Sequence, residues 1–246
     1  DIRRSLLNMK SIIEGQRSLA FWLSQQIDVS LNHPEKKVRE SAEELVSLMT
    51  PVVKSFFTDM GTEITNEAIQ VFGGYGYTKD QGIEQLYRDN RITPIYEGTN
   101  SVQAIDLVFR KVLNNKILSK FVKLIKDEIK NDKDKTELKK FSKILEHNLS
   151  LLLEFTNWLE DKNKNNKDDV SSACNDFLKV LGYISLGYLW FKTTKVSLEK
   201  FNENKDFYEE KINTAKYFFD KIFPRIQSHY HSAKTGSNTI MNAKFN

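Results

Sequence analysis

One stretch of the chain, residues 70–101, combines glycines, aromatic rings and a carboxylate in a way that could support catalysis. Gly73, Gly74 and Gly76 lie close together among aromatic residues, directly after a helical pattern. Backbone without side chains can approach a ligand closely, so this turn is a candidate binding site. Glu97 has apolar neighbours that favour a basic carboxylate, as proton abstraction requires. The residues by themselves leave open a simpler interpretation, in which Glu97 caps a helix and the glycines form an ordinary turn.

The elements that must position this segment are predicted to be helices. Apolar residues recur at helical spacing from Ile2 to Ile27, which predicts one long amphipathic helix. We expect a second helix over 35–49 and a third from Thr50 to about residue 72, since a hydroxyl followed by Pro51 is typical of a helix start. Helical patterns then continue over 83–91, 102–112, 115–130, 136–160, 170–200 and 205–232, the last with a kink at Pro224. The polar stretch from Thr235 is expected to be irregular. No stretch alternates as a strand does, so the sequence predicts an all-α fold.

Composition excludes several classes of protein. The net charge of the 246 residues is only +4, and its 37 basic and 33 acidic side chains are interspersed, so no nucleic-acid partner is expected. No apolar run is long enough to span a membrane. The single cysteine, Cys174, predicts a buried small side chain in a reducing, cytoplasmic compartment. His229 and His231 should point apart on a helix, which favours surface residues over a metal site. Because the chain begins with Asp1, we expect it to be part of a longer protein.

Two signatures in register resemble those of the acyl-CoA dehydrogenases. Residues 70–77 read QVFGGYGY and residues 95–100 read IYEGTN, and their order and spacing match that family without a gap. The resemblance covers residues 1–113 and implies the family's C-terminal helical domain. Residues 114–246 resemble the additional helical domain of the bacterial subgroup that includes 3-methylmercaptopropionyl-CoA dehydrogenase. That second match includes a Gly-Tyr-Leu-Trp segment in residues 181–190, whose small and aromatic side chains also predict tight helix packing.

The resemblance implies a role for each residue of the two signatures. Glu97 would be the base that removes the α-proton of an acyl-CoA thioester, while Tyr96 would line the pocket and Gly98 would lie against the substrate. Arg88 and Asp89 are expected to form a supporting ion pair. The residues expected to contact FAD are Gln70, Val71, Phe72, Gly73 and Gly74, which would face the cofactor of a neighbouring subunit, and Thr99 and Ser101, which would face the chain's own.

The activity implied by the resemblance is oxidation of an acyl-CoA to the 2,3-enoyl-CoA. Electron-transfer flavoprotein would then be the electron acceptor, and the whole enzyme would be a homo-oligomer, a dimer or larger. This chain by itself would be inactive, because the family's upstream domains build the rest of the flavin site. Two alternatives stay open: an acyl-CoA oxidase or flavin-bearing repair homologue on the same scaffold, and a helical interaction module without chemistry. The intact Glu97 and glycine turn argue against the second.

Overall fold

The fold is built from helices throughout the part of the chain that the computed structural model describes, which is residues 1–114, 117–130 and 136–245. Every regular element in these ranges is helical, which confirms the predicted all-α class. The predicted helix start at residue 115 lies outside them. The elements are α1 Ile2–Asn32, α2 Lys36–Phe72, α3 Gly74–Tyr77, η1 Lys79–Gln81, α4 Ile83–Arg91, α5 Asn100–Ile105, η2 Asp106–Val112, α6 Ile117–Lys130, α7 Thr136–Asn165, α8 Lys167–Glu199, α9 Lys205–Tyr217, η3 Phe218–Ile222, α10 Arg225–Ala233 and α11 Asn238–Met241.

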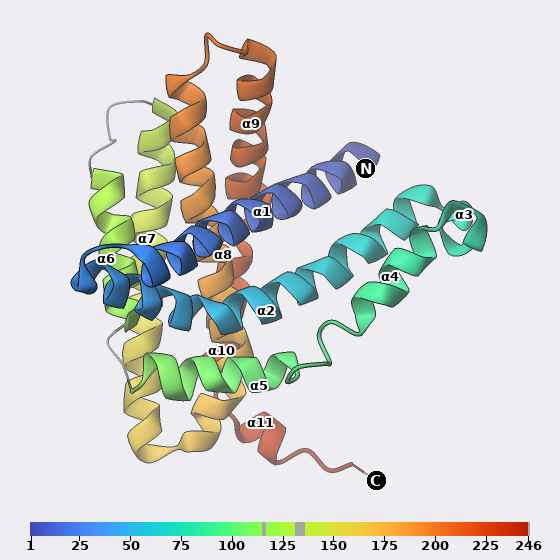
Figure 1. Ribbon diagram of the computed structural model, residues 1–246. Coiled ribbons are helices and arrows are strands. Elements are labelled where there is room, and N and C mark those ends of the chain that lie inside the picture. Colours follow the sequence, from blue (N-terminus) through green and yellow to red (C-terminus); the bar gives the residue numbers. More distant parts are fainter. Residues whose placement is uncertain (115–116, 131–135, 246) are drawn as a thin grey trace.

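The first two helices form an antiparallel pair that crosses the long helices of the second half (Figure 1). Leu19 of α1 and Leu48 and Phe56 of α2 are fully buried. They belong to one hydrophobic cluster that also contains residues of α5 to α8 and α10. Helices from residues 1–113 and from residues 114–246 both contribute to this cluster, so the two predicted domains share one core. None of the helices in the described ranges combines the length and apolarity that a membrane crossing requires.

The prediction that one helix ends at residue 49 and another starts at Thr50 is wrong. α2 runs without a break from Lys36 to Phe72 with Pro51 in its interior. Thr50 does not cap a helix start, since its hydroxyl donates 2.7 Å to the Val46 carbonyl one turn earlier. An interior proline costs a helix about 3 kcal/mol or more. Burial of Pro51 and complete burial of Met49 and Val52 beside it offset that cost.

Helix α8 lies at the centre of the molecule (Figure 1) and packs on α1, α2, α5, α7, α9 and α10. All residues from 180 to 191 are buried, as expected for a helix that is apolar on every side. Gly182 and Gly187 allow this packing, because an added Cβ would lie 2.4 Å from the Phe56 ring and 2.5 Å from the Phe223 ring. The tight helix packing predicted for residues 181–190 is confirmed.

The predicted interruption of the last long helix is also confirmed. α9 continues into the π-helical turn η3, and Pro224 then precedes α10. The tail beyond Thr235 was expected to be irregular, yet it contains the short helix α11. Asp169 of α8 explains how this tail is held. Its Oδ1 atom accepts hydrogen bonds of 2.8 Å from both the backbone N–H and the hydroxyl of Ser237.

Candidate active site

The segment that contains Glu97 is a loop between α4 and α5, and α4 holds its first end. α4 packs on α2, where the Asn90 amide donates 2.8 Å to the Thr62 hydroxyl and 3.3 Å to the Thr58 carbonyl. A Cβ at Gly61 would lie 2.4 Å from the Asn90 side-chain oxygen. The glycine in α2 therefore provides the space for the contact that positions the loop.

Glu97 and Gly98 adopt a left-handed backbone, with φ angles of 52° and 83°. This conformation costs a non-glycine residue about 1–2 kcal/mol, and such strain often marks functional sites. Both carbonyls of the turn accept hydrogen bonds from elsewhere. Gln103 Nε2 donates 3.2 Å to the Glu97 carbonyl, and Lys54 Nζ donates 2.7 Å to the Gly98 carbonyl. The strained turn is thus held from α5 and from α2.

The carboxylate of Glu97 does not cap the following helix. α5 begins at Asn100, and its N-cap is Thr99, whose hydroxyl accepts 3.4 Å from the Val102 N–H. Within the described ranges the Glu97 side chain and its backbone N–H have no hydrogen-bond partner, and the residue is exposed. The capping interpretation is therefore wrong. The sequence predicted apolar surroundings for the Glu97 carboxylate, and the described part of the chain does not provide them, since the residue is exposed.

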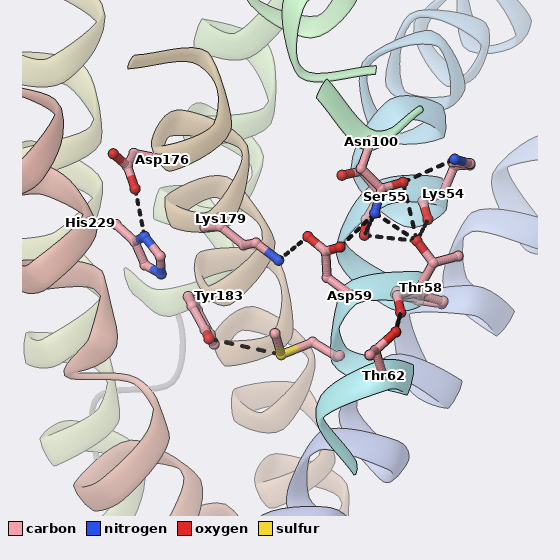
Figure 2. A network of polar contacts seen from close by, with 12 residues as sticks. Lys54, Ser55, Thr58, Asp59, Thr62, Asn100, Asp176, Lys179, Tyr183 and His229 are labelled. Atoms are coloured by element: carbon pink, nitrogen blue, oxygen red, sulfur yellow. Dashed lines mark hydrogen bonds and ion pairs between the residues drawn. The ribbon is translucent and has the colours of Figure 1, made fainter. Parts of the chain in front are cut away.

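Asn100 anchors the second end of the loop, and the sequence interpretation missed it. Its backbone N–H donates 3.1 Å to the Pro94 carbonyl and so closes the loop. Its side-chain oxygen accepts 2.9 Å from Lys54 Nζ, and its side-chain nitrogen donates 2.6 Å to Asp59 Oδ1 (Figure 2). A cation on one side and a carboxylate on the other determine the orientation of the amide. The nitrogen also reaches the Ser55 carbonyl at 3.1 Å.

The glycine turn lies at the far end of α2 (Figure 1). Gly73 has a φ of 61°, and a Cβ added at Gly73 or Gly74 would meet no atom within 4 Å, so the backbone is open to a ligand. Gly76 differs, because its Cβ would lie 2.6 Å from the Ile69 carbonyl; it serves local packing. Of the other expected flavin contacts, Gln70, Phe72, Thr99 and Ser101 are exposed and Val71 is half-buried.

The structure does not bring the glycine turn and Glu97 together. The nine residues of α4 separate them, which corresponds to about 13 Å at 1.5 Å per residue. Two separate exposed segments result, one at the end of α2 with Gly73 and one before α5. Tyr96 is half-exposed beside Glu97 and Gly98, which are exposed as well.

The expected ion pair between Arg88 and Asp89 does not form, since both side chains are exposed and no contact between them is present in the described ranges. Asn90 supports the loop instead. His229 was expected at the surface, and its side chain is half-buried there, with 29% exposed. Its Nδ1 atom lies 2.7 Å from Asp176 Oδ1, because α10 packs on α8. His231 is exposed as expected, and the described ranges contain no cluster of three side chains that could hold a metal.

Known proteins resemble the chain over its whole length. It is 41% identical over 115 residues to 3-methylmercaptopropionyl-CoA dehydrogenase of Ruegeria pomeroyi, which covers 47% of this chain and 19% of that protein. It is 28% identical over 98% of its length to the broad-specificity linear acyl-CoA dehydrogenase FadE5 of Mycobacterium tuberculosis, of which it spans 42%. An acyl-CoA dehydrogenase structure from Bacillus anthracis, complexed with FAD, superposes with a TM-score of 0.73 at 16% identity, covering 99% of this chain and 43% of that one.

Two family models match successive parts of the sequence. The model described as "Acyl-CoA dehydrogenase, C-terminal domain" matches residues 1–112, and the one described as "Acetyl-CoA dehydrogenase C-terminal like" matches residues 121–244. The chain spans less than half the length of the relatives above. The superposition on the Bacillus anthracis structure shows that the two chains share this fold. These matches identify the chain as a member of the acyl-CoA dehydrogenase family.

Proposed function

We propose that this chain supplies the catalytic base and part of the flavin site of an FAD-dependent acyl-CoA dehydrogenase. Glu97 removes the α-proton of the acyl thioester, and the product is the 2,3-enoyl-CoA. The observation that carries this assignment is the strained turn at Glu97, whose carbonyl and that of Gly98 are both held while its carboxylate is exposed and unpaired within the described residues. A carboxylate of this kind is available to a substrate.

The same turn offers a donor for the thioester oxygen. An α-proton next to a thioester is a weak acid, so the developing enolate oxygen needs hydrogen bonds while the proton leaves. The Glu97 N–H has no acceptor in the described ranges and so can donate to that oxygen. Gly98 adjoins it without a side chain, which leaves room for the thioester, and Tyr96 lines the acyl side of the surface.

The residues proposed for FAD are consistent with a backbone-lined contact. Gly73 and Gly74 have open space where side chains would stand, and Gln70, Val71 and Phe72 precede them at the end of α2. We assign these five to the FAD of a neighbouring subunit, and Thr99 and Ser101 to the chain's own FAD, because α4 separates the two groups. When bound, FAD supplies the acceptor for the β-hydride.

A role for a neighbouring subunit requires a homo-oligomer, a dimer or larger. The proposal further includes electron-transfer flavoprotein as the electron acceptor, a cytoplasmic location, and a division into residues 1–113, which carry the site, and 114–246, an additional helical domain. The relatives are called dehydrogenases of 3-methylmercaptopropionyl-CoA and of linear acyl-CoA. These names favour a dehydrogenase over the oxidase alternative.

The test is Glu97→Gln in the full-length, FAD-loaded protein, because glutamine keeps the size of the side chain and removes the base. A positioned base contributes roughly two to four orders of magnitude. Reduction of the flavin by butyryl-CoA, followed by loss of its absorbance in stopped flow, should slow by at least that much while FAD and butyryl-CoA still bind. A rate within tenfold of the wild type would show that another carboxylate is the base.

A further inference from the structure

The loop that carries Glu97 has little apolar packing behind it. A cleft of about 620 Å³ lies between α2, α4 and α8, with Asp59, Pro94 and Lys179 in its wall. Ile95 and Tyr96 of the loop are about half-exposed. Because the hydrophobic core does not reach the loop, its position depends on the polar contacts of Asn100 and Lys54 described above.

Those contacts continue into the second half of the chain. Asp59 holds the Asn100 amide with its Oδ1 atom, and its Oδ2 atom pairs with Lys179 of α8 (Figure 2). Only 17% of the Lys179 side chain and 31% of the Asp59 side chain are exposed. Lys179 Nζ also lies 5.6 Å from the centre of the Phe56 ring. The lysine therefore holds the half-buried carboxylate between α2 and α8, at the wall of the cleft.

We propose that Lys179 is a positioning residue for Glu97. It acts through Asp59 and Asn100, and so ties the catalytic loop to the additional helical segment. This inference rests on the proposed role of Glu97. Lys179 holds the Asp59 carboxylate in the orientation that receives the Asn100 amide. Asn100 in turn accepts from Lys54, which holds the Gly98 carbonyl. Without the lysine charge, the Asp59 carboxylate turns toward water in the cleft, and the Asn100 amide loses its hydrogen bond to Asp59 Oδ1.

The test compares Lys179→Met with Arg225→Met in the full-length, FAD-loaded protein. Arg225 is a matched control, because it also joins the second half of the chain to α2, through a 2.6 Å pair with Glu63, and it does not contact the loop. The first readout is hydrogen–deuterium exchange of peptides that span residues 94–103. Exchange there should accelerate in Lys179→Met and stay unchanged in Arg225→Met, and Lys179→Arg should restore protection.

The second readout separates rate from binding. A displaced base slows proton removal more than it weakens binding, and small misplacements cost up to about a hundredfold in rate. Flavin reduction at saturating butyryl-CoA should therefore be about tenfold slower in Lys179→Met or more, with a nearly unchanged Kd for butyryl-CoA. If Lys179→Met does not fold, Asp59→Asn replaces it in the test. This substitution keeps an acceptor for Asn100 but removes the ion pair, so the exchange rate and the rate of flavin reduction should change in the same directions.

Equal exchange of residues 94–103 in the Lys179 and Arg225 variants would overturn the inference, and so would an equal rate of flavin reduction. Failure of the proposed function has a different signature. In that case the wild-type flavin is not reduced by any acyl-CoA, while the exchange measurement still decides whether Lys179 holds the loop.

Discussion

Gly182→Ala tests how closely the central helix packs on the site-bearing half of the molecule. The new Cβ would lie 2.4 Å from Phe56 Cδ2 and 2.6 Å from its Cγ. Both atoms belong to a rigid ring near its attachment point, so the ring cannot swing away freely. Phe56 is fully buried and its ring meets Tyr183 edge-on, with centroids 4.9 Å apart. The methyl group therefore forces the ring or the helix to move by about 1 Å, the gap to ordinary contact distance.

The expected cost combines two opposing effects. Overpacking of a filled core costs about 1–3 kcal/mol, and this site belongs at the upper end because neither ring has free space. Replacing glycine by alanine inside a helix returns about 1 kcal/mol. The net loss in the free energy of unfolding is therefore about 2 kcal/mol, which for a chain of this size lowers the melting temperature by roughly 4–8 °C.

Thermal unfolding followed by circular dichroism measures this loss, with Gly74→Ala as the control. Gly74 is also helical, yet its added Cβ would meet no atom within 4 Å, so the same substitution should not lower stability and can raise it by up to about 1 kcal/mol. Phe56→Leu should destabilise by itself and yet partly relieve Gly182→Ala, giving a combined loss smaller than the sum. If Gly182→Ala melts like Gly74→Ala, the close packing of α8 on α2 is not rigid and the reasoning fails.

Two further predictions follow from buried ionisable groups. Hydrogen bonds from Lys162 and Ser237 lower the pKa of Asp169 from 3.8 to about 2. Its carboxylate therefore stabilises the fold above about pH 4 and loses this effect as the pH falls toward 2. Asp169→Asn should cost about 2 kcal/mol at neutral pH and flatten the acid limb of the stability curve; an unchanged acid limb would contradict this. Burial raises the pKa of the Cys174 thiol to about 12, so a thiol-specific disulfide reagent at neutral pH should label it only after denaturation, and rapid native labelling would refute its inaccessibility.

Local patterns were sufficient for the class of fold and for the positions of most helices. Composition identified the core character of α8, but apolar spacing located the buried face of α1 only in part. Leu19, Trp22 and Leu23 are buried, whereas the ends of the predicted stripe, Ile2 and Ile27, are exposed. The same reasoning failed at Pro51. The start signal there is real, but it competes with burial of its neighbours, and propensity is a weak guide where tertiary packing opposes it.

The sequence by itself determined that the chain is all-helical, that glycines end the long helix after residue 72, and that Glu97 stands before a helix as in the acyl-CoA dehydrogenases. The tertiary structure alone decided what holds Glu97 in place. Asp59, Asn100 and Lys179 are far apart in the sequence and carry no shared pattern, since their contact arises only where α2, α5 and α8 meet. Side-chain partners across packed helices depend on helix rotation and crossing, and no local periodicity encodes these.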